Sequence, residues 1–171
     1  MATTIKQTES LPESYPVLSP AVSDAVWQRI ESYTAHRFTS RQVVWIVEGC
    51  GEWMPPLAPA TVTKVEIWSS ADVWEDVTAN ASPCGGYWLP ATGPYRFTAT
   101  VGADAELPVI VATAAQRLST YMAAKPGKPG ATSESVSAGS ISVSHRRSES
   151  WMAAAMQNSG AADLLRGYRR V

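Results

Sequence analysis

The sequence predicts an α+β fold, in which a small helical bundle carries an inserted antiparallel β subdomain and an extended C-terminal arm. Apolar residues recur at helical spacing in residues 20–36 and 108–124. Between these segments, residues 41–101 contain short β-type runs separated by glycine and proline. Residues 132–171 follow as the predicted arm. With 171 residues, the chain is long enough to bury a core.

The N-terminal part is expected to be a flexible tail followed by a helix. Residues 1–18 are mostly polar and lack apolar periodicity, which favours the tail. Ser19 can cap the helix, and Pro20 suits its first position because the N–H that proline lacks has no partner there. The apolar stripe consists of Val22, Val26, Ile30 and Tyr33. A helix over residues 20–36 is therefore predicted, and its stripe must pack against another surface.

The middle of the chain, residues 41–101, has the pattern of a small antiparallel sheet or sandwich. Four or five short runs there are rich in β-branched and aromatic residues. These runs lie at residues 43–47, 62–68, 73–74, 87–89 and 95–101. Apolar and polar residues alternate in residues 62–68 and 95–101, as they do in half-buried strands.

The second helix is predicted over residues 108–124. Glu106 precedes it and favours the positive end of the helix dipole. The sequence KPGKPG at residues 125–130 cannot continue the helix. We expect residues 19–125 and 126–171 to form one domain, with the β subdomain inserted between its helices.

The C-terminal arm, residues 132–171, begins with a serine-rich alternating stretch. Residues 136–143 can form an extended segment that lies on a partner's sheet edge, with a bulge near Gly139 where the apolar phase shifts. A third helix is expected around residues 151–156, and a short last helix at residues 161–166.

Charge is unevenly distributed, although the formal net charge is only −1. Residues 41–106 carry eight acids and three bases, whereas residues 145–171 carry five arginines and two acids. Opposite charges at two ends of a small protein suit head-to-tail contact between identical copies, or contact with two different partners. Chance scatter is the alternative interpretation.

No residue pattern indicates catalysis, a metal site or a cofactor. Cys50 and Cys84 lack metal-ligand spacing and are expected to be free thiols in a reducing cytoplasm. His36 and His145 have no nucleophile near them in sequence, and GxSxG and phosphate-loop motifs are absent. No stretch has the apolar length of a membrane span or a signal peptide. We expect neither an enzyme nor a membrane protein.

Tryptophan is abundant, with seven residues in the chain. Five of them crowd the β subdomain: Trp45, Trp53, Trp68, Trp74 and Trp88. A carbohydrate-binding platform is one interpretation, and core or subunit-contact positions are the simpler one.

The closing sequence LLRGYRRV favours docking onto another protein. Arginine and tyrosine are enriched at protein-protein hot spots, and the acids nearby dilute a nucleic-acid footprint. The candidate contact residues are Leu164, Leu165, Arg166, Tyr168, Arg169 and Arg170.

Six segments in this order resemble the tailed-phage head-tail connectors of the adaptor or head-completion type. They are HRFTSRQ (36–42), ATVTKVEIW (60–68), PYRFTATVG (94–102), ELPVIVATAAQRL (106–118), TSESVSAGSISVSH (132–145) and SGAADLLRGYRRV (159–171). The resemblance covers nearly the whole chain after Ser19.

The resemblance implies a ring, usually of twelve copies, beneath the portal of the capsid, with the helices forming the ring body. Double-stranded DNA would pass through its channel without sequence-specific binding, and a stopper or tail-completion protein would attach below. Residues 142–171 of the arm would engage the portal, with Leu164, Leu165 and Tyr168 as apolar anchors and the neighbouring arginines as charged contacts. The expected location is the virion neck, after assembly in the bacterial cytoplasm. The alternative is a tail or baseplate component that holds a carbohydrate through the tryptophan-rich insertion.

Overall fold

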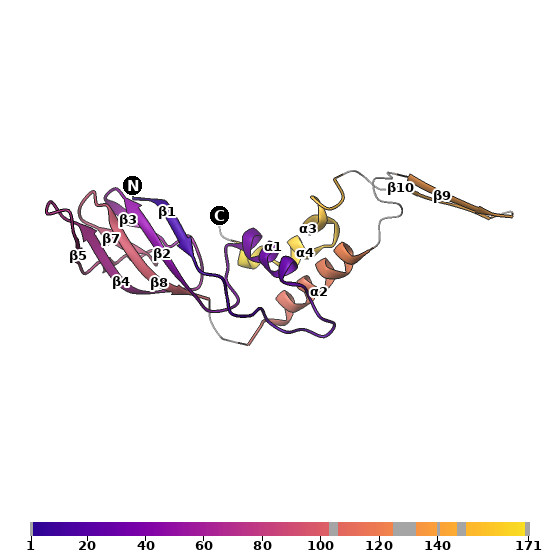
Figure 1. The fold of residues 1–171 in the computed structure, drawn as a ribbon, viewed down its shortest axis with the longest axis horizontal. Helices are drawn as coiled ribbons and strands as arrows, with labels where there is room; N and C mark the ends of the chain where they lie inside the picture. Colours follow the sequence, from indigo (N-terminus) through magenta and orange to yellow (C-terminus); the bar gives the residue numbers. More distant parts are fainter. Residues whose placement is uncertain (1, 103–105, 125–132, 140, 147–149, 170–171) are drawn as a thin grey trace. The chain divides into compact units, whose positions relative to one another are not determined.

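The chain folds into two compact units in the computed structural model, which describes residues 2–102, 106–124, 133–139, 141–146 and 150–169 (Figure 1). The β unit contains Met1–Pro16 and Glu31–Glu106, and the helical unit contains Val17–Ile30 and Leu107–Arg169. The α+β class with a β subdomain is confirmed. The inserted β subdomain and the helices of the expected connector domain correspond to two compact units of contacts.

The β unit is built on a five-stranded antiparallel sheet with the order β1-β2-β8-β4-β5 (Figure 1). Its strands are β1 (Thr3–Glu9), β2 (Arg41–Glu48), β4 (Ala60–Trp68), β5 (Trp74–Asp76) and β8 (Tyr95–Val101). Every second residue of β2 and β8 is buried. The alternating sequence predicts this for β8, whereas β2 contains a continuous β-branched and aromatic run over residues 43–47. The predicted subdomain limits, residues 41 and 101, coincide with the start of β2 and the end of β8.

A second, three-stranded sheet has the order β3-β7-β6. It consists of β3 (Gly51–Trp53), β6 (Asn80–Ala81) and β7 (Tyr87–Leu89). Trp53 and Leu89 from this sheet belong to the same core as Trp45 and Phe97 from the larger one. The ring centroids of Trp53 and Phe97 are 4.3 Å apart, so aromatic packing joins the two sheets.

The expected flexible tail over residues 1–18 is wrong for β1, which pairs with β2 along its length. The indole N–H of Trp45 donates to Gln7 Oε1 at 2.8 Å, and that of Trp53 donates to Thr4 Oγ1 at 2.9 Å. Polar residues are therefore required in this strand, because they bind buried indole groups that otherwise lack acceptors. That requirement removes the apolar alternation by which a strand is recognised in sequence.

The helical unit is organised around α2 (Val109–Ala123), within one residue at each end of the predicted helix. The remaining helices are α1 (Asp24–Thr34), α3 (Ala155–Asn158), α4 (Ala161–Leu164) and the 3-10 helix η1 (Arg166–Tyr168). Helix α1 starts later than predicted because the carbonyl of Ser23, not that of Ser19, accepts the first helical hydrogen bonds. It ends before Ala35, whose φ of 55° is left-handed. Its last turn, residues 31–34, counts with the β unit.

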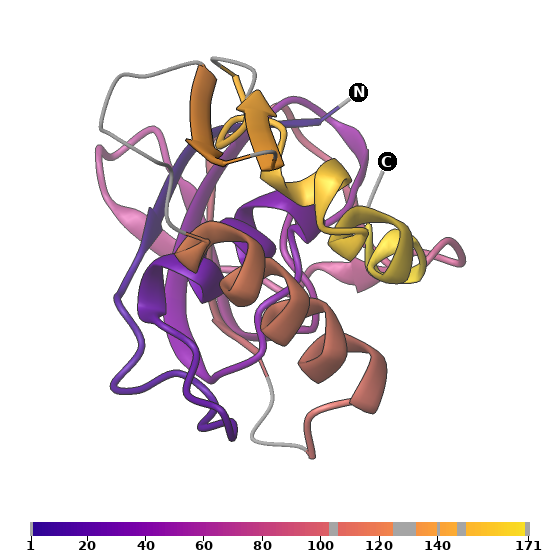
Figure 2. The ribbon, with the colours of Figure 1, turned by 90° about the vertical axis from the view of Figure 1, so that its right-hand side faces the viewer.

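The single extended segment with a bulge that was expected over residues 136–143 is corrected. Strands β9 (Ser133–Ala138) and β10 (Ile141–Arg146) form an antiparallel hairpin, so the chain reverses where a bulge was expected. Gly139, with a φ of 62°, supplies the left-handed backbone at the reversal. Beyond the hairpin, α3 and α4 pack beside α2 (Figure 2), and they bury Met156, Ala161 and Leu165.

Candidate docking surfaces

The described residues offer several candidate contact surfaces. They contain no group of three or more His, Cys, Asp and Glu side chains that could hold a metal ion. Cys50 and Cys84 are both exposed and unpaired, as predicted. His36 stacks on Phe38, with ring centroids 4.7 Å apart. Of the helices that the structure describes, none is long and apolar enough to cross a membrane.

The predicted C-terminal contact residues lie on α4, η1 and the residues next to them. Leu165 is fully buried, Leu164 and Tyr168 are partly buried, and Arg166 and Arg169 are exposed. These side chains therefore divide between the interior and the surface of the helical unit. Arg170 lies outside the described residues.

The interior position of Leu165 follows from the local backbone. The N–H of Leu165 donates to the carbonyl of Ala161 at 3.0 Å, and the N–H of Tyr168 donates to the carbonyl of Leu165 at 3.0 Å. This arrangement seats Leu165 in the helical unit and leaves Arg166 at the surface, where it pairs with Asp163 at 3.3 Å. An exposed pair of this kind adds little stability, so both groups remain available to a partner.

Contacts from elsewhere in the helical unit hold this C-terminal region in place. Arg29 Nη2 donates to the carbonyls of Met152 at 2.8 Å and Ala153 at 2.9 Å. Asn158 Nδ2 donates to the hydroxyl of Tyr121 at 3.0 Å, which ties α3 to α2. The surface around Arg166 is therefore presented by a packed scaffold.

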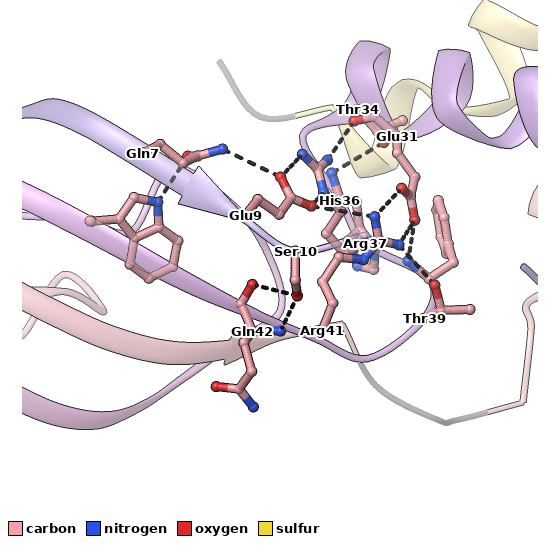
Figure 3. Close-up of polar contacts among 12 residues, drawn as sticks. Gln7, Glu9, Ser10, Glu31, Thr34, His36, Arg37, Thr39, Arg41 and Gln42 are labelled. Carbon is pink, nitrogen blue, oxygen red and sulfur yellow. Dashed lines mark hydrogen bonds and ion pairs between the residues drawn. The ribbon is translucent and has the colours of Figure 1, made fainter. Parts of the chain in front are cut away.

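A cluster of two arginines and two glutamates lies in the β unit, between the end of β1, the last turn of α1 and the start of β2 (Figure 3). Arg37 binds Glu9 with both Nε, at 2.5 Å, and Nη2, at 2.8 Å. Arg41 binds Glu31 through Nη2 at 2.7 Å and Nη1 at 2.9 Å. Arg41 and Glu31 are buried and Arg37 and Glu9 are partly buried, and the two pairs hold β1, α1 and β2 together.

Sequence reasoning does not identify this cluster. Glu9 lies in the stretch interpreted as a flexible tail, far along the chain from both arginines. Glu31 is buried and therefore needs a partner, but the sequence does not mark it, because it directly follows Ile30 and successive residues of a helix do not share a face. The partner itself depends on the tertiary fold.

A second charged group lies on the larger sheet. Arg96 binds Glu66 through Nε and Nη2, both at 2.6 Å, and Lys64 Nζ contacts the same carboxylate at 2.8 Å. Hydrogen bonds from Arg96, and then from Lys64, lower the pKa of Glu66 to about 2. The Arg96 guanidinium also lies over the ring of Trp74, 4.5 Å from its centroid, and Trp74 packs against Trp68.

The tryptophans of the β unit serve different purposes. Trp45 and Trp53 are core residues. Trp74 has Arg96 over its ring, whereas Trp88 on β7 is 55% exposed. Trp88 is thus the tryptophan most available to a ligand or partner among those five.

The β9–β10 hairpin and strand β1 also expose apolar side chains. Val136 and Val143 are cross-strand partners in the hairpin, and they are 59% and 55% exposed. Ile5 of β1 is 57% exposed. Both elements are therefore candidate contact surfaces.

Comparison with known proteins yields structural matches. No protein-family model matches the chain, and no curated protein matches it. The fold is similar to a chain of the virion of a native gene transfer agent (GTA) particle, with a TM-score of 0.55 and 20% identity over 86% of this chain and 74% of that one. It is also similar to a chain from the neck of a native GTA particle computed with C12 symmetry, with a TM-score of 0.52 and 20% identity over 86% of this chain and 79% of that one. At this identity the likeness shows a common fold over most of the chain.

Proposed function

We propose that the chain is a structural protein of a phage-like virion neck, a head-tail connector of the adaptor type without catalytic activity. Copies assemble as a ring of twelve beneath the portal, with the helical unit in the ring body. The ring offers a surface to a stopper or tail-completion protein. Double-stranded DNA passes through the channel without sequence-specific binding. Assembly takes place in the cytoplasm of the bacterial host.

The fold carries this proposal. The two similar chains belong to a virion and to a neck, and that neck was computed with C12 symmetry. The match extends over 86% of the chain, more than either unit alone contains. The order of sequence segments that resembles the connectors supports the same function independently.

The portal contact is assigned to the surface side chains of the C-terminal region. Arg166 and Arg169 supply exposed charge, and Leu164 and Tyr168 supply partly buried apolar area beside it. Arg170 continues the same basic sequence. Leu165 acts indirectly, because its side chain holds α4 and η1 in the helical unit. A ring repeats this contact in every copy, so weak single contacts give a durable joint.

The proposal is tested with the purified chain and the portal protein encoded in the same genome. Light scattering and electron microscopy should show rings and a ring-portal complex. A double charge reversal, Arg166→Glu with Arg169→Glu, should weaken portal binding at least about tenfold, since hot-spot residues contribute more than about 1.4 kcal/mol. A matched control reverses two exposed acids, Glu13→Lys with Glu75→Lys, and should keep binding. Failure to form either a ring or a portal complex would refute the proposal.

Trp88 gives the carbohydrate-binding alternative a specific residue. Its cross-strand neighbours on β3 and β6 are Glu52 and Asn80, which are hydrogen-bonding side chains beside an exposed ring. Saturable binding on a glycan array that Trp88→Ala removes would favour this alternative over the connector.

A further inference from the structure

Strand β1 is an edge strand of the five-stranded sheet. It pairs with β2 on one side, and no other described element packs extensively against it. The register shifts between Thr4 and Lys6, and residues 6–9 then pair regularly with β2. The side chains of Lys6 and Thr8 are exposed. An edge of this kind has N–H and C=O groups that point away from its own sheet and can bind another strand.

The β9–β10 hairpin lacks the third strand that would stabilise it. It forms a two-stranded sheet of its own, and each of its strands makes its main described contacts with the other. An isolated two-stranded hairpin is marginally stable in water, and a third strand or a packing surface stabilises it. Val136 and Val143 are directly opposite each other and both exposed. The hairpin is thus a preformed element that lacks a third strand.

We propose that the β9–β10 hairpin of one copy adds to the free edge of β1 in the next copy, so that the two sheets become continuous across the subunit boundary. This inference rests on the proposed ring, and it names the contact that closes it. Each copy supplies one hairpin and one β1 edge. Such a contact between two different surfaces is heterologous, and it closes into a ring when the rotation between copies allows.

The chemistry of the two elements suits this pairing. Main-chain hydrogen bonds provide most of the attraction in strand addition, and therefore the serine-rich sequence of the hairpin is no obstacle. Ile5 on β1 supplies an exposed apolar side chain for the exposed valines of the hairpin. The register irregularity at Ile5 and the charge of Lys6 hinder nonspecific pairing of β1 with other strands, because bulges and edge lysines disfavour edge-to-edge association. Residues 6–9 are regular and remain able to pair with the hairpin.

Cross-linking tests the contact directly. In a background with Cys50→Ser and Cys84→Ser, the pair Thr8→Cys and Val143→Cys is introduced into the full chain. A short bismaleimide should then give a ladder of covalent oligomers in denaturing gels. The control pair combines Val143→Cys with Val73→Cys, an exposed residue next to β5 at the opposite margin of the same sheet. The control should give no ladder beyond dimers.

A second variant measures the same contact by assembly. Val136→Asp with Val143→Asp places charges on the hairpin, and it should raise the protein concentration for half-assembly about tenfold or more, equal to about 1.4 kcal/mol. Val73→Asp should leave that concentration unchanged.

The outcomes separate this inference from the proposed function. Rings in electron microscopy together with a ladder only for the Thr8 pair support the strand addition. Rings with no ladder, or with equal ladders for both pairs, overturn it and leave the connector function standing. A ladder for the Thr8 pair alone that appears only after the portal is added also supports the strand addition, because both cysteines belong to this chain and the cross-link therefore joins two copies of it. If no rings form at all, the proposed function fails and this inference fails with it.

Discussion

Arg41 and Glu31 form a bidentate ion pair whose side chains are almost completely buried. Their side chains are 5% and 4% exposed, and the two hydrogen bonds measure 2.7 and 2.9 Å. Glu31 Oε1 also accepts the N–H of Phe38 at 3.1 Å, so the carboxylate fixes the loop between α1 and β2 as well. The desolvation of two charges offsets much of their attraction, and the pair is therefore needed mainly because each buried charge requires the other.

Removing the Glu31 charge should thus destabilise the protein strongly. We expect Glu31→Gln to lower the free energy of unfolding by about 3 kcal/mol, because Arg41 stays buried and its remaining ion pair is the longer one with Glu9 at 3.3 Å. Urea denaturation followed by circular dichroism measures the change. The matched control is Asp163→Asn, which removes the exposed partner of Arg166 and should cost about 0–1 kcal/mol. Equal losses in the two variants would contradict the role assigned to the buried pair.

The ion pair between Glu66 and Arg96 should make the free energy of unfolding depend on pH. The pKa of Glu66 is about 2 in the folded chain, below its ordinary value of 4.5, so folding favours the ionised carboxylate. This stabilisation is fully present above about pH 4.5 and is lost as the pH falls toward 2. We expect Glu66→Gln to lower stability at neutral pH and to approach the parent protein near pH 2, as urea titrations at several pH values can show. In an Arg96→Gln background the same substitution should have a smaller effect. A pH-independent difference would refute this linkage.

Elements with strong local patterns were predictable from the sequence. Helix α2 matches its predicted limits because a regular apolar stripe is followed by KPGKPG, which no helix can continue. Strand β8 was predictable because its apolar and polar residues alternate, and β2 because residues 43–47 form a β-branched and aromatic run. In these elements the local sequence pattern alone indicates the type of secondary structure.

The remaining elements depend on distant contacts. Strand β1 has the sequence of a flexible tail because its polar residues Thr4 and Gln7 accept hydrogen bonds from the indoles of Trp53 and Trp45. Both tryptophans lie far along the chain, so the sequence near β1 gives no sign of these contacts. Leu165 is predicted as an apolar anchor, and its burial within the helical unit was not predictable because α4 is too short to show a periodic stripe. The reversal at Gly139 has the same local signal as a bulge, since both use a glycine with positive φ.

Neighbouring leucines of the C-terminal region should respond differently to truncation. We expect Leu165→Ala to lower the free energy of unfolding by about 3 kcal/mol, since the buried side chain leaves a cavity. Leu164→Ala, at a partly buried position, should change stability by less than about 1 kcal/mol and yet weaken portal binding. Urea denaturation and a binding titration with the portal measure the two effects. If Leu165→Ala leaves stability intact, its side chain is not held inside the helical unit.

Two tryptophans of the small sheet should likewise separate folding from surface contact. Trp53 packs on Phe97 and donates to Thr4, so we expect Trp53→Ala to cost about 3 kcal/mol or more, measured by urea denaturation. Trp88, on the adjacent strand β7, is 55% exposed, and Trp88→Ala should stay within about 0.5 kcal/mol of the parent protein. Because Trp88→Ala keeps the fold, it also isolates the surface role of this residue. A connector should assemble with or without Trp88 and show no saturable glycan binding, whereas loss of a measurable glycan affinity in Trp88→Ala alone would identify the small sheet as a carbohydrate site.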